Sequence, residues 1–272
     1  MKTSAYETQI LEWRTGKYDE LVRESGWLAL AGLFWLKPGR NLVGANPMCE
    51  VILPESAPTF LGVVEYKGKT ARLQVAEGLN VKVNGRSVQK AILRSDREAK
   101  PSFITWGGIR MVLHEHAGRF AFRIWDNERP NRFSLPPLKW FPINKAFRIP
   151  ARYTRYPSSK KSEQFDSIGD VAEDRMDGYV TFKFEGKTYK LDATRTKSGK
   201  LFIKFKDLTS GKETYPPGRY YYTEPMKNGR VTLDFNYAYS PPCVFTEFAT
   251  CIFAPAQNNL PFRVEAGEIY RG

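Results

Sequence analysis

Apolar positions follow two different spacings along the chain, a helical one at the start and a strand-like one afterwards. Residues 4–25 carry apolar side chains that would form one stripe on a helix, namely Ile10, Leu11, Trp13, Leu21 and Val22. Ser4 and Glu7 have the spacing of a capping box, which satisfies backbone donors at a helix start. Gly16 is expected to bend or break this helix. The pattern predicts a helical segment over residues 1–26.

Beyond this segment, short apolar runs are separated by glycine-bearing turns about every ten residues. The turn pairs include Lys67-Gly68, Glu77-Gly78, Asn84-Gly85, Gly107-Gly108, Ala117-Gly118, Glu185-Gly186 and Asn228-Gly229. Asn84-Gly85 suits a tight hairpin, because both residues tolerate positive φ. Regularly spaced short strands of this kind predict an antiparallel sheet folded into a sandwich or barrel.

The second half of the chain shows clear alternation of apolar and polar positions. The apolar members Val180, Phe182 and Phe184 are expected to face a core, whereas Thr181 and Lys183 between them face solvent. The same alternation recurs at Leu201, Ile203 and Phe205. The sequence therefore predicts a second antiparallel β domain.

Residues 126–161 interrupt the strand pattern with six prolines, at positions 130, 136, 137, 142, 150 and 157. Proline removes a backbone donor and fixes φ, so this stretch is expected to be an ordered crossing segment and not part of a sheet. The fold class predicted is mainly β. Three regions follow from these patterns: an N-terminal helical segment at 1–26, an antiparallel β-sandwich at 27–137 and a C-terminal β domain at 138–272.

Length and cysteine content exclude some protein classes. A chain of 272 residues buries enough surface to fold without disulfides or metals. The three cysteines lack metal-site spacing, which leaves either free thiols in a reducing compartment or a pairing of Cys243 with Cys251 across a turn. The longest apolar run, from Trp27 to Leu36, is shorter than the roughly 20 residues that span a bilayer. With no apolar signal region at the start, a soluble cytoplasmic protein is expected, the alternative being a chain from which a signal peptide has been removed.

Charge points toward anionic partners. The formal net charge is +13, and residues 139–206 hold 16 Lys and Arg against 8 Asp and Glu. Such a field favours phosphorylated metabolites, nucleic acid or an acidic surface, whereas the alternative is a generically basic surface without a specific partner. The stretch ARYTRYPSSKK at 151–161 has the interleaved cations and aromatics of single-strand nucleic-acid binders, but a solvated connection has the same composition. An anionic small molecule is the favoured partner, and nucleic acid the less favoured one.

Metal and cofactor motifs are sparse. His114 and His116 are the only histidines and share one face of an expected strand. They could ligate a metal only with a carboxylate from elsewhere, so a hydrogen-bonded or solvent-facing pair is the favoured interpretation. No GxGxxG, Walker-type or HExxH motif occurs, and no cofactor or metal is predicted.

The first β region resembles a forkhead-associated domain over roughly residues 28–125. The resemblance is carried by Gly44 after an apolar strand, the strand EVILP at Glu50–Pro54, the hairpin VNGRSV at Val83–Val88, and Leu93 with Asp96. It implies an antiparallel β-sandwich. The family follows its glycine with arginine and serine, where this chain has Ala45 and Asn46. Without those donors for a phosphate, no binding of phosphothreonine peptides is expected.

The C-terminal region resembles family 1684 of the domains of unknown function. The resemblance is carried by DLTSGKETYPPGRYYYTEP, by VTLDFNYAYSPPCVFTEFATCIFAPAQNNLPFRVEAGE and by the N-terminal stretch at Gly26–Asn41. It implies membership and no particular activity. The family usually has asparagine where this chain has Ser240, and C-P-x-P-P where this chain has Cys251 to Pro255. A catalytic role for that asparagine would not carry over, whereas serine can serve as a turn cap.

Polar residues are dense in this C-terminal region, which makes it the candidate site. The ligand-binding candidates are Arg219, Tyr221, Asp234, Asn236, Tyr239, Cys243 and Glu247. Asp234 is the candidate general base, Arg219 the candidate anion anchor and Cys243 a candidate nucleophile. Cys243 has no local histidine, and a carboxylate pair would join Asp234 to Glu247 or Glu265. Alternatively these polar residues only cap turns, and Arg219 pairs with a carboxylate to close the fold.

Two functions follow from these patterns. The first is a protein that binds a polar or anionic small molecule in its C-terminal β domain, with or without catalysis. The alternative is a non-catalytic interaction scaffold whose basic surface binds a protein partner or a polyanion.

Overall fold

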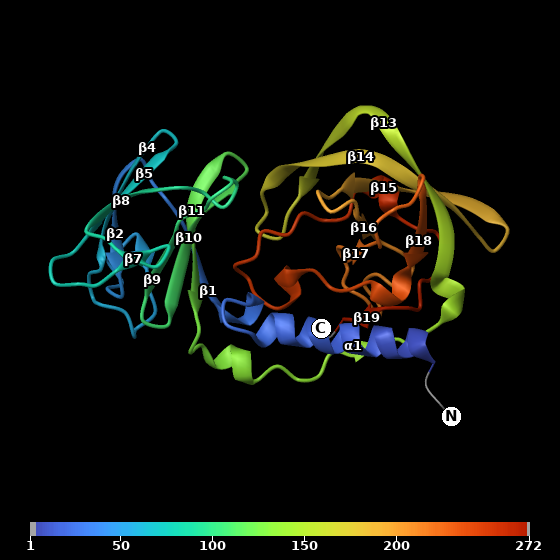
Figure 1. The fold of residues 1–272 in the computed structure, drawn as a ribbon, viewed down its shortest axis with the longest axis horizontal. Coiled ribbons are helices and arrows are strands. Elements are labelled where there is room, and N and C mark those ends of the chain that lie inside the picture. Colours follow the sequence, from blue (N-terminus) through green and yellow to red (C-terminus); the bar gives the residue numbers. More distant parts are fainter. Residues whose placement is uncertain (1–3, 271–272) are drawn as a thin grey trace. The chain divides into compact units, whose positions relative to one another are not determined.

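The computed structural model describes residues 4–270 and divides into two compact units, each described by itself below (Figure 1). The sandwich unit comprises Glu20–Leu135 and Phe245–Ala249. The three-segment unit comprises the residues up to Asp19, Pro136–Val244 and the residues from Thr250 onward. The outermost residues of the predicted regions, 1–3 and 271–272, lie outside the described residues.

The sandwich unit consists of two sheets that share one apolar core. The larger sheet has the order β1 (Leu30–Trp35), β11 (Arg119–Asp126), β10 (Ile109–His116), β9 (Phe103–Trp106), β6 (Lys82–Val83) and β7 (Arg86–Ser87). The other has the order β3 (Val51–Ile52), β2 (Gly39–Gly44), β4 (Gly62–Lys67), β5 (Thr70–Val75) and β8 (Lys90–Leu93). Strand pairs are antiparallel except β2 with β3. Val64 and Leu73 of one sheet join Met111 and Phe122 of the other in one core, which confirms the predicted sandwich.

Glycine turns set the strand register as predicted. Asn84 and Gly85 have φ values of 49° and 81° and close the hairpin between β6 and β7. Two short 3-10 helices, η1 (Trp27–Ala29) and η2 (Pro130–Phe133), complete the unit.

The N-terminal helix α1 spans Ala5–Val22. Ser4 and Glu7 form the predicted capping box, since the Ser4 N–H donates to Glu7 Oε2 at 2.8 Å and the Glu7 N–H to Ser4 Oγ at 3.3 Å. The expected break at Gly16 is wrong, because the helix continues through it. The predicted stripe is also partly wrong, because Leu11 is exposed whereas Ile10 is fully buried.

The three-segment unit is built on one six-stranded antiparallel sheet. Its strand order is β17 (Arg219–Tyr222), β16 (Leu201–Phe205), β15 (Lys187–Arg195), β14 (Val171–Phe184), β13 (Arg148–Phe165) and β18 (Arg230–Asp234). A separate pair joins β12 (Lys139–Trp140) to β19 (Glu268–Ile269). The short 3-10 helices are η3 (Lys145–Phe147), η4 (Phe235–Tyr237), η5 (Pro242–Val244) and η6 (Ala256–Asn258).

The core of this unit confirms the predicted alternation. Val180 and Phe182 of β14 are buried and Phe184 packs against the same core, whereas Lys183 between them is exposed. Leu201, Ile203 and Phe205 of β16 are fully buried in it as well. The predicted mainly β fold class, with an N-terminal helix and antiparallel sheets, is therefore confirmed.

The prediction of a non-sheet crossing over residues 126–161 is wrong at β12 and from Arg148 onward. β13 begins at Arg148 and contains both Pro150 and Pro157, and it forms the long hairpin with β14 seen in Figure 1. The register between these strands is interrupted from Arg155 to Lys160, around Pro157. A strand can therefore pass through this proline because the ladder skips the position where an N–H would be required.

The two edge strands of the six-stranded sheet, β17 and β18, are bridged by one side chain. The Tyr221 hydroxyl donates to the Thr232 carbonyl at 3.2 Å and accepts from the Asp234 N–H at 2.7 Å. Edge backbone groups that would otherwise lack a partner are thereby satisfied. The sheet thus curves until its edges approach, and we call this junction the seam.

Along the described residues, no helix combines the length and the apolar character needed to cross a membrane.

Candidate functional site

A pocket of about 1430 Å³ lies beside the seam, and all its lining residues belong to the three-segment unit. Its walls come from α1, from β13, β14, β17 and β18, and from the turn before β18. This volume exceeds the roughly 300–1,000 Å³ typical of small-molecule sites. The pocket is therefore large enough for a metabolite with more than one recognition group.

Helix α1 supplies one wall through a single face. Tyr6, Gln9, Trp13 and Lys17 line the pocket, and their spacing of three and four residues places them on one side of the helix. The Trp13 ring packs edge-on against Tyr237, with ring centroids 5.0 Å apart. The Lys17 ammonium lies 4.3 Å from the centre of the Tyr239 ring, a cation–π contact. The wall is thus aromatic with a cation at one end.

Asp234 occupies the end of the pocket where β18 runs into η4, and both of its carboxylate oxygens accept hydrogen bonds. Oδ2 accepts from the Tyr6 hydroxyl at 2.9 Å and lies 3.7 Å from Nε of Arg148. Oδ1 accepts from the Asn236 N–H at 3.2 Å and from its side-chain amide at 2.9 Å. Burial and the neighbouring Asp234 raise the pKa of Tyr6, so its hydroxyl stays protonated as a donor. This carboxylate caps η4 and ties α1 to the sheet.

The lining of the pocket as a whole is strongly cationic. Seven Lys and Arg side chains line the pocket against two carboxylates; the cations are Lys17, Arg148, Arg152, Lys183, Lys200, Lys227 and Arg230. Arg148 and Arg152 are four residues apart on β13 and therefore share one face. The carboxylates are partly neutralised locally, since Asp234 faces Arg148 and Glu224 lies 3.7 Å from Lys200.

Arg152 and Arg230 are directly opposite each other on β13 and β18. Both side chains are exposed and line the pocket. Among residues 4–270, no carboxylate lies within ion-pair distance of either guanidinium. Like charges directly opposite on a sheet are destabilising. An anion placed between them would remove this repulsion.

The structure brings together four of the seven predicted ligand residues. Tyr221, Asp234 and Tyr239 line the pocket, and Asn236 donates to Tyr6 beside it at 3.1 Å. The remaining three, Arg219, Cys243 and Glu247, do not line it.

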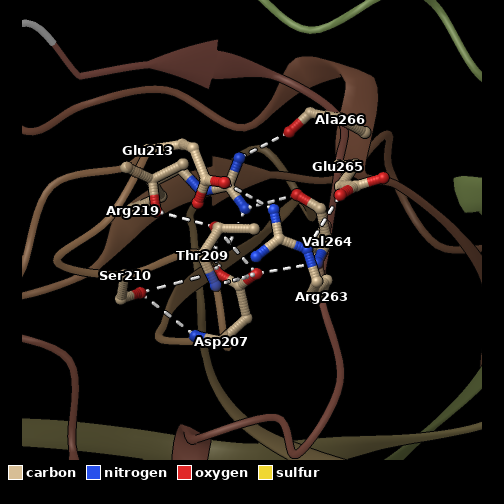
Figure 2. A network of polar contacts seen from close by, with 10 residues as sticks. Asp207, Thr209, Ser210, Glu213, Arg219, Arg263, Val264, Glu265 and Ala266 are labelled. Carbon is tan, nitrogen blue, oxygen red and sulfur yellow. Dashed lines mark hydrogen bonds and ion pairs between the residues drawn. The ribbon is translucent and has the colours of Figure 1, made fainter.

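Arg219 is fully buried and makes structural contacts instead (Figure 2). Its guanidinium donates to Asp207 Oδ1 at 3.2 Å, to the Val264 carbonyl at 2.9 Å and to the Ala266 carbonyl. Both members of its ion pair with Asp207 have no exposed side-chain surface. The guanidinium therefore holds the C-terminal segment against the sheet, which matches the alternative in which Arg219 closes the fold.

The other two candidates also lie apart from the pocket. Cys243 lies on η5, with Sγ 3.6 Å from the Tyr215 hydroxyl. Glu247 belongs to the sandwich unit, and Glu265 is paired with Arg263 at 2.8 Å. Neither of these carboxylates lines the pocket with Asp234.

The histidine pair lies in the sandwich unit, in β10. His114 is buried, with Nδ1 2.6 Å from Asp96 Oδ2 and Nε2 3.0 Å from Nη2 of Arg123. Burial lowers the pKa of His114. Both ring nitrogens of His114 thus lie beside protein partners.

Sequence reasoning missed the α1 wall and most of the cationic face. The wall could not be found locally, because Tyr6 is 228 residues from its partner Asp234. A usable signal was present in RIPAR and RVTLD. Arg148 and Arg152 are four positions apart, so they share one face of an expected strand, and Arg230 begins another strand. The excess positive charge of residues 139–206 pointed to the same region.

Comparison with known proteins found solved structures that are similar to parts of this chain. A search of curated proteins found no match. The solution structure of an uncharacterised protein from gene locus rrnAC0354 of Haloarcula marismortui is 30% identical, with a TM-score of 0.43; the match covers 51% of this chain and 78% of that one. The structure of Rv0020c_FHA is 17% identical, with a TM-score of 0.24, and covers 35% of this chain and 94% of that one.

The family match rests on the C-terminal half of the sequence. The sequence model described as "Protein of unknown function (DUF1684)" matches residues 134–269. The stretch at Gly26–Asn41, part of the expected resemblance, lies outside the match. The matched segment contains all six strands of the sheet whose edges meet at the seam. The chain therefore belongs to the DUF1684 family.

Proposed function

We propose that the pocket of the three-segment unit binds a small organic anion that also carries an aromatic or other apolar portion. The observation that supports this most directly is the opposed pair Arg152 and Arg230, which line the pocket without a carboxylate partner among residues 4–270. A carboxylate or phosphate accepts several N–H donors from such a pair. Its binding would replace repulsion by two charge-assisted contacts.

The aromatic wall supports the second half of the proposal. Trp13, Tyr237 and Tyr239 lie together on the α1 side of the pocket, and Tyr222 lines it from β17. Aromatic rings offer a flat apolar surface on which a planar ligand stacks. A ligand with an anionic head and an apolar body would satisfy both walls at once.

Binding is better supported than proton transfer. Asp234, the candidate general base, already accepts from Tyr6 and Asn236 and lies beside Arg148. A base needs a lone pair directed at the proton it removes. The protein is therefore proposed as a binding protein for anionic metabolites.

The test is a thermal-shift titration with matched ligands. Indole-3-acetate and adenosine monophosphate serve as aromatic anions, indole-3-acetamide as the neutral analogue and inorganic phosphate as the bare anion. A ligand at 100 times its Kd adds about 2.7 kcal/mol to stability, which is readily measured. The aromatic anions are expected to stabilise most, phosphate less, and the neutral amide least.

Variants assign the effect to the pocket. Arg152→Ser combined with Arg230→Ser should abolish the shift. The control combines Arg155→Ser with Arg195→Ser, which removes two exposed arginines of the same sheet that do not line the pocket. Equal shifts in both double variants, or no stabilisation by any anion, would contradict the proposal. Retention on heparin that survives in the pocket variant would favour an extended polyanion on another surface.

A further inference from the structure

Two of the three cysteines lie together in the three-segment unit, outside the pocket. Cys243 is on η5 and partly exposed, and Cys251 is buried eight positions later. The Cys243 N–H donates to Cys251 Sγ at 3.3 Å. The connection between them is short, so bringing the two sulfurs together carries a small loop-closure cost.

The surroundings of the pair favour the thiolate form of Cys243 over that of Cys251. A hydrogen bond from the Cys251 thiol lowers the pKa of Cys243 to about 7, and the same interaction raises the pKa of Cys251. The Tyr215 hydroxyl, 3.6 Å from Cys243 Sγ, acts in the same direction. A thiolate is the nucleophilic form of cysteine, and the more exposed sulfur of this pair is the one that forms it.

We propose that Cys243 and Cys251 form a redox-active pair that interconverts between two thiols and a disulfide. Cys243, which solvent reaches, is the attacking sulfur. Cys251, which is buried beside it, is the resolving sulfur. The site is independent of the anion pocket, since neither cysteine lines it.

The co-reactant is a low-molecular-weight disulfide, and the reaction proceeds in two steps. The Cys243 thiolate attacks one sulfur of the small disulfide, forms a mixed disulfide and releases the first small thiolate. Cys251 then loses its proton to solvent and attacks Cys243 Sγ, which forms the protein disulfide and releases the second thiolate. Together the two protein thiols lose two electrons, and the small disulfide gains them and is reduced to two thiols.

Cys49 provides an internal reference. It is buried in the sandwich unit, and burial raises the pKa of its thiol. It should remain reduced under conditions that oxidise the pair. Alkylation should therefore detect three thiols in the reduced chain and one in the oxidised chain.

The experiment equilibrates the full chain with oxidised and reduced glutathione at graded ratios, followed by acid quenching, maleimide alkylation and peptide mapping. A Cys243–Cys251 disulfide is expected, and Cys49→Ser should form it equally well. Cys251→Ser should trap one glutathione on Cys243, because the resolving sulfur is missing. Cys243→Ser should take up none.

Two results would overturn the proposal. One is a wild-type chain that keeps three alkylatable thiols at every ratio, including in pure oxidised glutathione. The other is a disulfide that maps to Cys49. Both are read on the wild-type chain and so do not depend on the folding of any variant. Iodoacetamide alkylation of Cys243 with a midpoint near pH 7 supports the assigned order of attack, and equal rates at Cys243 and Cys49 contradict it.

Discussion

At the scale of single residues, Arg219 and Arg263 show how much depends on whether water reaches a guanidinium. Both belong to the network in Figure 2 and both pair with carboxylates. Arg219 and Asp207 are fully buried, whereas Arg263 and its partners are well exposed. Desolvation lowers the pKa of Arg219, and the carboxylate beside it compensates only in part. Removal of either partner leaves a buried charge without compensation.

Arg219→Met should therefore destabilise the protein by about 3–5 kcal/mol, because Asp207 would remain buried without its cationic partner. Urea unfolding followed by circular dichroism measures the change. The control is Arg263→Met, the same substitution at an exposed position of the same network, with a much smaller effect expected. Similar losses for the two variants would show that the buried pair has no special role.

Glu268 gives a pH dependence with a defined sign. The carboxyl group is buried on β19, which raises its pKa from 4.5 to about 7. The folded protein therefore holds this proton more tightly than the unfolded chain, and stability from this group is fully present below pH 4.5 and lost as pH rises to about 7. The loss over that window is about 3 kcal/mol.

Glu268→Gln should flatten the dependence of stability on pH between 4.5 and 7. Its amide oxygen can still accept from the Ser240 N–H, which donates to the carboxylate at 3.0 Å in the native chain. Chemical unfolding of both proteins at half-unit pH intervals tests this. The prediction is wrong if the two curves stay parallel.

At the scale of elements, the seam depends on one hydroxyl. Tyr221 is buried, and its hydroxyl serves backbone groups of Thr232 and Asp234. Tyr222, the next residue on β17, is exposed and stacks on Phe202. The two tyrosines therefore differ in whether their hydroxyl has a protein partner.

Tyr221→Phe should cost about 1–3 kcal/mol, because a buried donor and a buried acceptor lose their partner. Tyr222→Phe should be close to neutral. Hydrogen exchange adds a local measurement, since the Asp234 amide should lose protection only in the first variant. Unchanged protection of that amide would show that the seam closes without the hydroxyl.

The opposed arginines of β13 and β18 predict a stability cost that the unliganded protein bears. A double-mutant cycle with Arg152→Thr and Arg230→Thr should give a repulsive coupling of a few tenths of a kcal/mol. High salt should weaken it, because exposed charges are screened. An attractive or salt-independent coupling would contradict repulsion between the two guanidinium groups.

At the scale of the whole molecule, local patterns were predictable and long-range assembly was not. The capping box, the Asn84-Gly85 turn and the alternation in β14 each depend on residues close in sequence. The course of β13 through two prolines was missed, because the permitted gap in its ladder depends on its partner strand. The role of Arg219 was undetermined, because burial is a property of the folded chain and sequence shows only the residue type.

The family match leaves out an element that completes the pocket. It begins at residue 134, whereas α1 supplies Tyr6, Trp13 and Lys17 to the pocket wall. A chain of residues 134–272 should therefore bind aromatic anions more weakly and unfold at lower urea concentration than the full chain. A full-length Trp13→Ala variant tests the α1 wall separately. Undiminished binding by both the shortened chain and this variant would contradict the role of that wall.

The assembly of one unit from three chain segments affects the order of events during synthesis. Arg14 bonds to Phe141, 127 residues later, and Tyr6 to Asp234, 228 residues later. At about 5–20 residues per second, a ribosome needs roughly 10–45 s to proceed from Tyr6 to Asp234. Until then, the pocket-lining face of α1 lacks Asp234, Tyr237 and Tyr239, its native partners at Tyr6 and Trp13. Nascent chains should therefore depend on chaperones that shield this face until the last strands emerge.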